Sequence, residues 1–378
     1  MEKVRLCDIC DFQGGSQPPK DEWSFEQKDG YIRMLQIRDF TQTRNVEKEY
    51  IKLTSSTKTC EVDDILIARY GASVGKILTG LSGAYNVAIM KTIPNKRLLN
   101  KSYLKYYLLS DYFQNRINSV GERAAQAGFN KEDLSKLFIS LVSLEEQKRI
   151  ADELDNVSNL IDKRKQQLSK LDELVKARFV ELFGECQEHK RLEEYAALIT
   201  KGASPKWQGV DYCEEGTLFV TSENVREGYL DLSKRKYLDD KINEIQPRSI
   251  LKRNDILINI VGASIGRAAV YDCDEIANIN QAVALVRVDY SQINQIYLMT
   301  FLNSPQAIEM YGKMKKGGAR DNLSLQNIAD LQIPVAPMEL QNQFANFVEQ
   351  TDKSKLAVQQ SLEKLETLKK SLMQKYFG

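Results

Sequence analysis

Apolar residues recur with a period of seven through two stretches of the chain, residues 144–183 and 338–377, that contain neither glycine nor proline. A sustained seven-residue apolar repeat is typical of a coiled-coil seam. The pattern predicts two long helices, each about 60 Å in length at 1.5 Å per residue. The seam positions that we expect to form this spacer are Leu154, Ile161, Leu168 and Val175 in the first stretch and Leu362, Leu365 and Leu372 in the second.

The ends of both stretches carry residues that begin or terminate helices. Ser143 and Glu146 have the spacing of a capping box, in which each side chain satisfies a free amide of the first turn. Pro337 precedes the second stretch, and proline is favoured at the first helical position. Gly184 and Gly378 follow the last apolar residues, where a glycine in the left-handed conformation commonly ends a helix. The sequence therefore predicts both ends of both helices.

Two arrangements of these helices are open. Each helix can pack on the surface of its own domain, or the two can pair with each other. A stripe of this length exceeds the surface of a small domain, which favours pairing. The order domain–helix–domain–helix makes the pair antiparallel.

The remaining segments mix short β-branched runs with glycine, proline, asparagine and aspartate. The runs predicted as strands are residues 64–68, 86–93, 255–261 and 282–288. Helical patterns follow at 102–118 and 293–314. We expect an α+β fold with two mixed domains separated by an antiparallel coiled coil. The predicted boundaries are 1–142 and 185–336 for the domains and 143–184 and 337–378 for the helices.

The two halves of the chain repeat each other, which indicates an internal duplication. The run Asp64-Ile-Leu-Ile recurs 191 positions later at Asp255, and Gly71-Ala-Ser-Val-Gly-Lys76 recurs as Gly262-Ala-Ser-Ile-Gly-Arg267. Further matches pair Asn86 with Asn280 and Gln147 with Gln341.

Composition indicates a protein of a reducing compartment. The sequence is 42% hydrophobic and 28% charged, the formal net charge is +1, and no apolar run approaches the length needed to span a bilayer. Six scattered cysteines are too few for a disulfide scaffold, and the first residues lack the apolar core of a signal peptide. We expect a cytoplasmic protein that contacts no membrane.

Two short cysteine patterns raise the question of a metal. Cys7 with Cys10 and Cys186 with His189 supply four residues of the types that bind zinc. The second half has no cysteine at the stretch matching Cys7 and Cys10, and small buried apolar residues explain that pair equally well. We expect no metal site.

The duplicated order of elements resembles the specificity subunits of type I restriction–modification systems. The resemblance covers the whole chain and is carried by the repeated Asp-Ile-Leu-Ile and Gly-Ala-Ser-(Val/Ile)-Gly-(Lys/Arg) blocks, by Asn280-Gln281, and by the segment from Ile333 to Gln341. The first half departs from this pattern, because Asn86-Val87 replaces Asn-Gln and residues 140–143 lack both prolines. The first departure weakens any shared contact at that position.

The resemblance implies a non-catalytic, DNA-binding protein. Each mixed domain would be a target-recognition domain that reads one half of a bipartite, asymmetric sequence in double-stranded DNA. The helices would dock two modification subunits, which bind S-adenosylmethionine and methylate adenine. Restriction subunits would join through them. S-adenosylmethionine, ATP and Mg²⁺ would belong to these partners, and this chain would bind no cofactor.

The candidates for DNA contact are basic or amide side chains in loops beside the duplicated blocks, because such groups bind phosphates and base edges. The two glycine-rich blocks lack the spacing of a nucleotide-binding loop, which indicates tight turns between strands. The candidates are Arg38, Arg69, Lys76, Arg123, Asn224, Arg267, Gln281, Lys313, Lys315, Lys316 and Arg320.

Two other functions compete with DNA recognition. A free-standing methyltransferase or nuclease would need catalytic motifs, but Gln17-Pro-Pro-Lys20 lacks the Asn and the aromatic residue of an adenine-binding segment, and His189 is the sole histidine. A coiled-coil adaptor that binds only proteins remains open because the net charge is close to zero.

The segment from Lys313 to Arg320 combines clustered positive charge with glycine, so we predict that it contacts DNA phosphates. Replacing Lys315 and Lys316 with alanine should weaken duplex binding and make the dependence of affinity on salt concentration shallower. Affinities measured at several salt concentrations test this, and unchanged values would remove the cluster from the interface.

Overall fold

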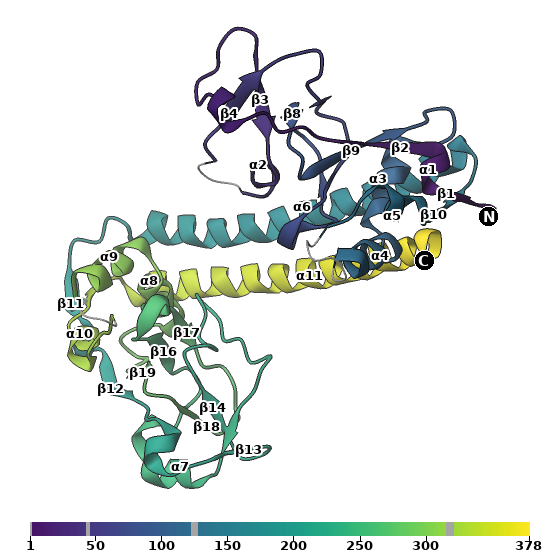
Figure 1. The fold of residues 1–378 in the computed structure, drawn as a ribbon. Coiled ribbons are helices and arrows are strands. Elements are labelled where there is room, and N and C mark those ends of the chain that lie inside the picture. The colour runs from purple at the N-terminus through teal and green to yellow at the C-terminus, as the bar shows by residue number, and fades with distance from the viewer. Residues whose placement is uncertain (1, 43–45, 122–127, 315–320) are drawn as a thin grey trace. The chain divides into compact units, whose positions relative to one another are not determined.

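The computed structural model describes residues 2–42, 46–121, 128–314 and 321–378. The chain divides into two compact units (Figure 1). Unit 1 comprises residues 1–165 and 360–378, and unit 2 comprises residues 166–359. Each unit therefore contains a mixed domain and half of each long helix. No helix within the described ranges is both long and apolar enough to cross a membrane.

Unit 1 contains two four-stranded sheets. The first has the order β2-β9-β6-β7, with every neighbouring pair antiparallel. The second has the order β4-β3-β8-β5, and in it β3 and β8 run parallel. The strands are β2 (Cys10–Gly14), β3 (Tyr31–Leu35), β4 (Glu49–Lys52), β5 (Thr59–Cys60), β6 (Leu66–Ala68), β7 (Ile77–Leu78), β8 (Gly83–Tyr85) and β9 (Ile89–Pro94).

A short antiparallel pair and several helices complete the mixed domain of unit 1. Strand β1 (Glu2–Arg5) pairs with β10 (Phe138–Leu141), the strand directly before the first long helix. The helices are α1 (Leu6–Ile9), α2 (Ile37–Thr41), α3 (Lys101–Leu109), α4 (Asp111–Gly121) and α5 (Lys131–Ser135). The single helical pattern expected at 102–118 is thus two helices, broken at Ser110.

Unit 2 repeats this topology, which confirms the duplication. Its first sheet, β12-β19-β16-β17, is again fully antiparallel, and its second, β13-β15-β14-β18, again contains one parallel pair, β14 with β18. The units differ at the outer strands of the second sheet, where β5 pairs with β8 but β13 pairs with β15. The strands are β11 (His189–Arg191), β12 (Ala196–Lys201), β13 (Tyr212–Cys213), β14 (Thr217–Val220), β15 (Tyr237–Leu238), β16 (Ile256–Asn259), β17 (Ala268–Val270), β18 (Ala277–Ile279), β19 (Val283–Val288) and β20 (Gln332–Pro334).

Short helices connect these strands. They are α7 (Lys241–Ile245), α8 (Gln295–Leu302), α9 (Pro305–Met314) and α10 (Leu325–Ala329). The pattern expected as one helix at 293–314 is therefore also two. The four runs predicted as strands correspond to β6, β9, β16 and β19, so the α+β interpretation is confirmed.

The two long helices are α6 (Leu144–Phe183) and α11 (Met338–Phe377), as the apolar repeat predicts. The Ser143 hydroxyl accepts a hydrogen bond from the Glu146 N–H at 3.2 Å. The expectation of a left-handed glycine at Gly184 and at Gly378 is wrong, because φ is positive at neither. Their N–H groups instead continue the helical hydrogen-bond pattern, to Val180 O at 2.8 Å and to Gln374 O at 3.0 Å.

Within unit 1, the first half of α6 packs against the last half of α11. The Tyr376 hydroxyl donates to Glu153 Oε2 at 2.8 Å, and Lys165 Nζ lies 3.3 Å from Glu366 Oε1. Residue numbers rise along one helix as they fall along the other, so the helices are antiparallel. The seam residues Leu154, Ile161, Leu362 and Leu372 are buried and Leu365 is half-buried.

Within unit 2, the second half of α6 meets the first half of α11 in the same orientation. Lys355 Nζ lies 2.7 Å from Asp172 Oδ1, while Leu168 and Val175 are half-buried. The helix ends also enter the core of the unit, as the rings of Phe179 and Phe344 are 5.4 Å apart. The helices therefore pair with each other and pack on the domains, so both proposed arrangements are partly present. The four boundaries given above remain a prediction.

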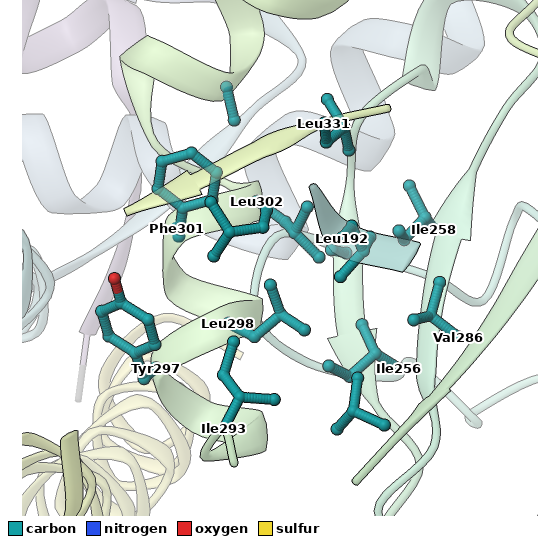
Figure 2. Packing of buried hydrophobic residues seen from close by; sticks show 14 of the residues in the cluster. Leu192, Ile256, Ile258, Val286, Ile293, Tyr297, Leu298, Phe301, Leu302 and Leu331 are labelled. Carbon is teal, nitrogen blue, oxygen red and sulfur yellow. The ribbon is translucent and has the colours of Figure 1, made fainter. Parts of the chain in front are cut away.

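The core of unit 2 lies between α8 and its first sheet (Figure 2). Tyr297 on α8 stacks on Phe179 with ring centroids 5.6 Å apart. The cluster that Figure 2 labels consists of Leu192, Ile256, Ile258, Val286, Ile293, Tyr297, Leu298, Phe301, Leu302 and Leu331. Removing so much apolar surface from water stabilises the unit.

Two buried glutamines attach the long helices to the domains in the same way. Gln147 Oε1 accepts from the Asn100 N–H at 2.8 Å, and Gln341 Oε1 accepts from the Asn294 N–H at 2.8 Å. Both side-chain amides also donate to carbonyl groups just before their helix. Each pair fixes the start of α3 or α8 against the first turn of a long helix.

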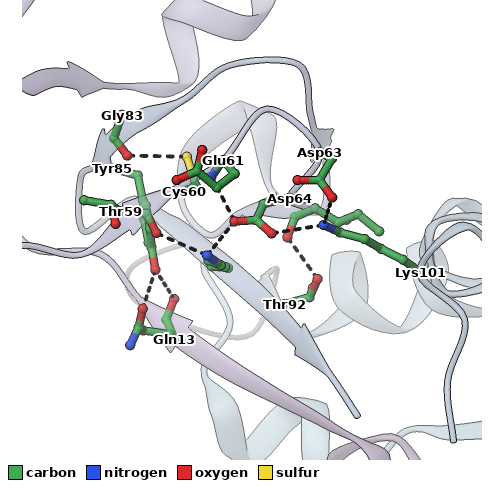
Figure 3. A network of polar contacts seen from close by, with 12 residues as sticks. Gln13, Thr59, Cys60, Glu61, Asp63, Asp64, Gly83, Tyr85, Thr92 and Lys101 are labelled. Atoms are coloured by element: carbon green, nitrogen blue, oxygen red, sulfur yellow. Dashed lines mark hydrogen bonds and ion pairs between the residues drawn. The ribbon is translucent and has the colours of Figure 1, made fainter. Parts of the chain in front are cut away.

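An aspartate at matching positions, Asp64 in unit 1 and Asp255 in unit 2, forms ion pairs beside the first sheet of each unit. In unit 2, Asp255 is fully buried and Arg287 binds both its oxygens, at 2.7 and 2.6 Å. In unit 1, Lys91 and Lys101 approach Asp64 to 2.5 and 3.1 Å (Figure 3). Burial alone would raise the pKa of Asp64, but the Glu61 N–H and the two ammonium groups lower it to about 2. Unit 1 is therefore stabilised by the ionised form.

We predict that this carboxylate makes the stability of unit 1 depend on pH. Because the pKa of Asp64 is lower in the folded chain than the usual value of about 3.9, its contribution is complete above about pH 4 and is lost as the pH falls toward 2. Asp64→Asn should lower the free energy of unfolding by about 2 kcal/mol at neutral pH. Denaturant unfolding at pH 7 and pH 3, with Asp21→Asn as the exposed control, measures this; an equal difference at both pH values would refute it.

Candidate nucleic-acid interface

Three segments of unit 1 meet at the end of strand β6. The Ala68 N–H donates to Lys76 O at 2.9 Å, and the Arg69 N–H donates to Ala88 O at 2.8 Å. On the third side, Tyr70 forms an isolated bridge with Gly128. We name residues 69–76, 86–88 and 128–129 turn cluster 1.

The same three segments meet at the end of β16 in unit 2. The Asn259 N–H donates to Arg267 O and the Ile260 N–H donates to Ala282 O, each at 2.9 Å. Val261 forms the matching bridge with Asn322. We name residues 260–267, 280–282 and 321–323 turn cluster 2. The duplicated blocks are therefore adjacent parts of one surface in each unit.

The glycine-rich block of each cluster is a tight turn between two antiparallel strands, which confirms the prediction. In unit 1 it contains the 3-10 turn η2 (Gly71–Ser73), and Gly71 and Gly75 have φ of +73° and +79°. Residues that carry a side chain rarely adopt this left-handed backbone conformation, so glycine is favoured at both positions. In unit 2 the matching Gly266 also faces the Tyr311 ring, which a Cβ would approach to 2.5 Å.

The asparagine block of each cluster is a turn that exposes one side chain. Asn86 Oδ1 accepts from the Ala88 N–H and Asn280 Oδ1 accepts from the Ala282 N–H, both at 3.1 Å. The residue between them is exposed in both units, as Val87 in cluster 1 and Gln281 in cluster 2. The turns are equivalent in backbone and different in chemistry.

The cations of the clusters fall into two kinds. Arg69 is held in place: its Nη1 donates to Val87 O and its Nε to Phe129 O, both at 3.4 Å, and its Cζ lies 4.9 Å from the Tyr70 ring centroid. Lys76 and Arg267 are exposed, and within the described residues neither has an acidic partner. Both are therefore available for an external anion.

Three further candidates make contacts within the chain. Arg38 is paired with Glu49, and Lys313 pairs with Glu309 at 2.7 Å on α9. Asn224 is buried, and its side chain holds its own loop through the Thr221 N–H and Asp231 O, each at 2.9 Å. Arg123, Lys315, Lys316 and Arg320 lie outside the described residues.

Two features of the clusters were missed by the sequence analysis. Gly15 and Gly202 pass so close to the asparagine turns that a Cβ would lie 2.2 Å from Asn86 O and 1.7 Å from Ile279 O. The signal available in the sequence was a glycine directly after β2 in unit 1 and directly after β12 in unit 2. Asn259 Nδ2 donates to Ser222 O at 2.9 Å and to Ser264 Oγ at 3.2 Å, which joins the loop of Asn224 to cluster 2. Unit 1 has Ala68 there, so no repeat revealed it.

No group of three or more metal-binding side chains occurs within the described ranges. Burial raises the pKa of the Cys10 thiol to about 12, so this thiol is neutral at physiological pH.

The family model for the type I restriction modification DNA specificity domain matches the chain twice, at residues 1–173 and 189–368. The chain belongs to this family. The two matches correspond to the two copies of the repeat and cover both turn clusters.

Two curated relatives are named type I restriction enzyme specificity subunits, and the chain aligns with most of the length of each. The chain is 23% identical to the type I restriction enzyme MjaVIII specificity subunit of Methanocaldococcus jannaschii, covering 98% of this chain and 91% of the relative. It is 25% identical to the EcoBI specificity subunit of Escherichia coli, covering 80% and 72%.

Solved structures share the fold. A chain from a study of complex assembly and conformational transition of the type I R-M system aligns with a TM-score of 0.64 at 17% identity, covering 100% of this chain and 97% of that one. The S subunit of a type I system from M. genitalium aligns with a TM-score of 0.59 at 16% identity, covering 100% and 96%.

We predict that Lys76 and Arg267 each contact a DNA phosphate. Lys76→Ala and Arg267→Ala should weaken binding to all duplexes alike and lower the slope of log affinity against log salt by about 1 each. Lys353→Ala is the matched control, because this exposed lysine pairs with Glu349 on α11. A slope that stays the same in both cluster variants would exclude these contacts.

Proposed function

We propose that the chain is the DNA-specificity subunit of a type I restriction–modification assembly and that each unit reads one half of a bipartite, asymmetric sequence. The observation that supports this most directly is one turn cluster built twice on the same backbone with different side chains. Arg69 corresponds to Ile260, and Val87 corresponds to Gln281. Two turns with the same backbone and different exposed side chains suit the recognition of two different half-sites.

The exposed groups of the clusters have the chemistry of groove recognition. A glutamine amide such as that of Gln281 can donate to and accept from the edge of adenine, whereas an apolar side chain such as Val87 can contact the methyl group of thymine. Lys76 and Arg267 would neutralise phosphates beside these turns. The phosphate contacts would supply affinity and the turn side chains specificity.

The long helices would determine the distance between the two half-sites. Each helix is 40 residues long, or about 60 Å, which corresponds to roughly one and three-quarter turns of B-DNA. The apolar seam residues of α6 and α11 face the partner helix, so partner subunits would bind the remaining faces of the two helices. Leu160, Leu174, Leu356 and Leu368 remain exposed on the helices and suit such docking.

The chemistry would belong to the partners. Two modification subunits would bind S-adenosylmethionine and methylate adenine, and restriction subunits would use ATP and Mg²⁺. In this chain His189 lies in β11, outside both clusters, with its Nδ1 3.1 Å from Gln187 O. We therefore assign His189 no catalytic role. We also propose that the assembly acts in the cytoplasm.

A protein-binding adaptor is the second candidate function, because the formal net charge is only +1. Duplex binding that weakens steeply with salt distinguishes the two, since each phosphate contact releases counterions. An adaptor would show no such dependence.

Methylation mapping after co-expression with a cognate modification subunit tests the proposal and its spacing mechanism together. We predict a two-part target for the parent chain. Insertion of one heptad into the middle of both α6 and α11 should lengthen the gap by about 3 base pairs, because seven helical residues add about 10 Å. The half-sites themselves should stay the same and serve as the internal control. A methylated site with its original gap would refute the spacing mechanism, and the absence of a two-part site would refute the function.

A further inference from the structure

Trp207 is the most exposed large apolar side chain of the described residues, with 88% of its surface accessible. Tryptophan carries a large apolar surface and is enriched among the residues that dominate binding interfaces. Its exposure on the surface of a folded unit therefore calls for a partner.

The segment around Trp207 is a turn held by backbone hydrogen bonds and two buried side chains. It lies in the 3-10 turn η4 (Pro205–Gln208), where its N–H donates to Ser204 O at 3.1 Å. Pro205 and Val210 are buried on either side, and the Val210 N–H donates to Pro205 O at 3.1 Å. Because the backbone of this turn is already ordered, binding through Trp207 would not have to order the loop.

The segment that leads into this turn passes beside turn cluster 2. Gly202, five residues before Trp207, is the glycine whose backbone packs on the Ile279 carbonyl beside the Asn280 turn. From Lys201 to Trp207 the chain carries two lysines and no acid. Lys201 and Lys206 are exposed, and the described part of the chain offers neither an ion-pair partner.

The acids nearest in sequence lie on the other side of Trp207. Asp211, Glu214 and Glu215 follow the buried Val210, in and around β13. The stretch that connects Trp207 to the cluster is therefore positively charged, and it suits a polyanion better than the mixed surface of a protein.

The corresponding loop of unit 1 uses its tryptophan differently. Trp23 is half-buried, its Nε1 donates to Pro18 O at 3.1 Å, and it packs against Met34, Ile51 and Ala84. Trp23 is thus explained by the fold, whereas Trp207 has no such role in unit 2.

We propose that Trp207 contacts the DNA half-site read by unit 2. Its indole ring packs on a deoxyribose of the DNA backbone, and Lys206 binds the adjacent phosphate. This inference rests on the proposed function, because it adds a contact residue to the same site.

Affinity measurements with the full chain test the contact. Trp207→Ala should weaken binding to a duplex carrying the mapped target roughly 5- to 100-fold, as expected when a large aromatic contact is removed from an interface. Trp207→Tyr should restore most of the affinity, and Lys206→Ala should lower the salt slope by about 1. Ile276→Ala is the control, because Ile276 is 64% exposed and lies before β18, at the end away from the Asn280 turn. Equal thermal unfolding midpoints of all variants verify that the fold is retained.

Fluorescence gives an independent readout. The chain has two tryptophans, so Trp23→Phe leaves Trp207 as the single reporter. The target duplex should quench its emission and protect it from acrylamide, and a duplex with the unit 2 half-site scrambled should do so less.

The outcomes separate this inference from the proposed function. If the parent binds the target duplex but Trp207→Ala binds equally well and the reporter remains accessible to acrylamide, the inference is overturned and the function stands. If Trp207→Ala instead loses a co-purifying modification subunit with its DNA affinity intact, Trp207 binds a protein and the inference is likewise overturned. If the parent binds no duplex DNA, both fail.

Discussion

The packing of the long-helix ends into the core of each unit is the interaction on which the rest of the structure depends. Unit 1 includes residues 360–378, more than two hundred positions from its own domain in sequence, and unit 2 includes the end of α6. Phe344, Phe179 and Tyr297 form one aromatic contact group in unit 2, while Phe377 meets Tyr103 in unit 1 at 5.0 Å. Because apolar burial is the main favourable term in folding, neither core is complete until distant segments have met. The helices are thus structural parts of both domains as well as connections between them.

The folded sheets determine where the turn clusters lie. In each first sheet, the end of one inner strand, β6 or β16, is fixed between two neighbouring strands. The glycines at positive φ then form a tight turn, and the cation that follows it, Lys76 or Arg267, is exposed. The asparagine turn on the other side is closed by its own side chain. Backbone geometry therefore supplies the position, and the exposed residues are free to differ between the units.

The sequence predicts the long helices well because a seven-residue repeat over 40 residues is a strong signal with few competing explanations. It also finds the duplicated turns, since glycine spacing reflects backbone conformation directly. It fails where tertiary contacts decide. Nothing local shows that Asn224 is buried and engaged with Asp231, that Arg38 is neutralised by Glu49, or that Trp23 and Trp207 have opposite exposures. The left-handed end expected at Gly184 fails for a related reason, because glycine permits that conformation without requiring it.

The ion-paired carboxylates of the first sheets bear on how the two copies of the duplication are related. Asp64 and Asp255 occupy the same position, yet the first is neutralised by Lys91 and Lys101 and the second by Arg287, all of which follow the acid along the chain. A genetic crossover between the two copies, placed after the shared aspartate and before the next strand, would bring the acid together with one complete set of cations in either product. Neither hybrid would enclose an uncompensated charge, which is among the most destabilising outcomes of a substitution in a core. Each copy therefore supplies its own neutralising side chains downstream of the shared aspartate, so this ion pair is retained when the strands before the aspartate in one copy replace those of the other.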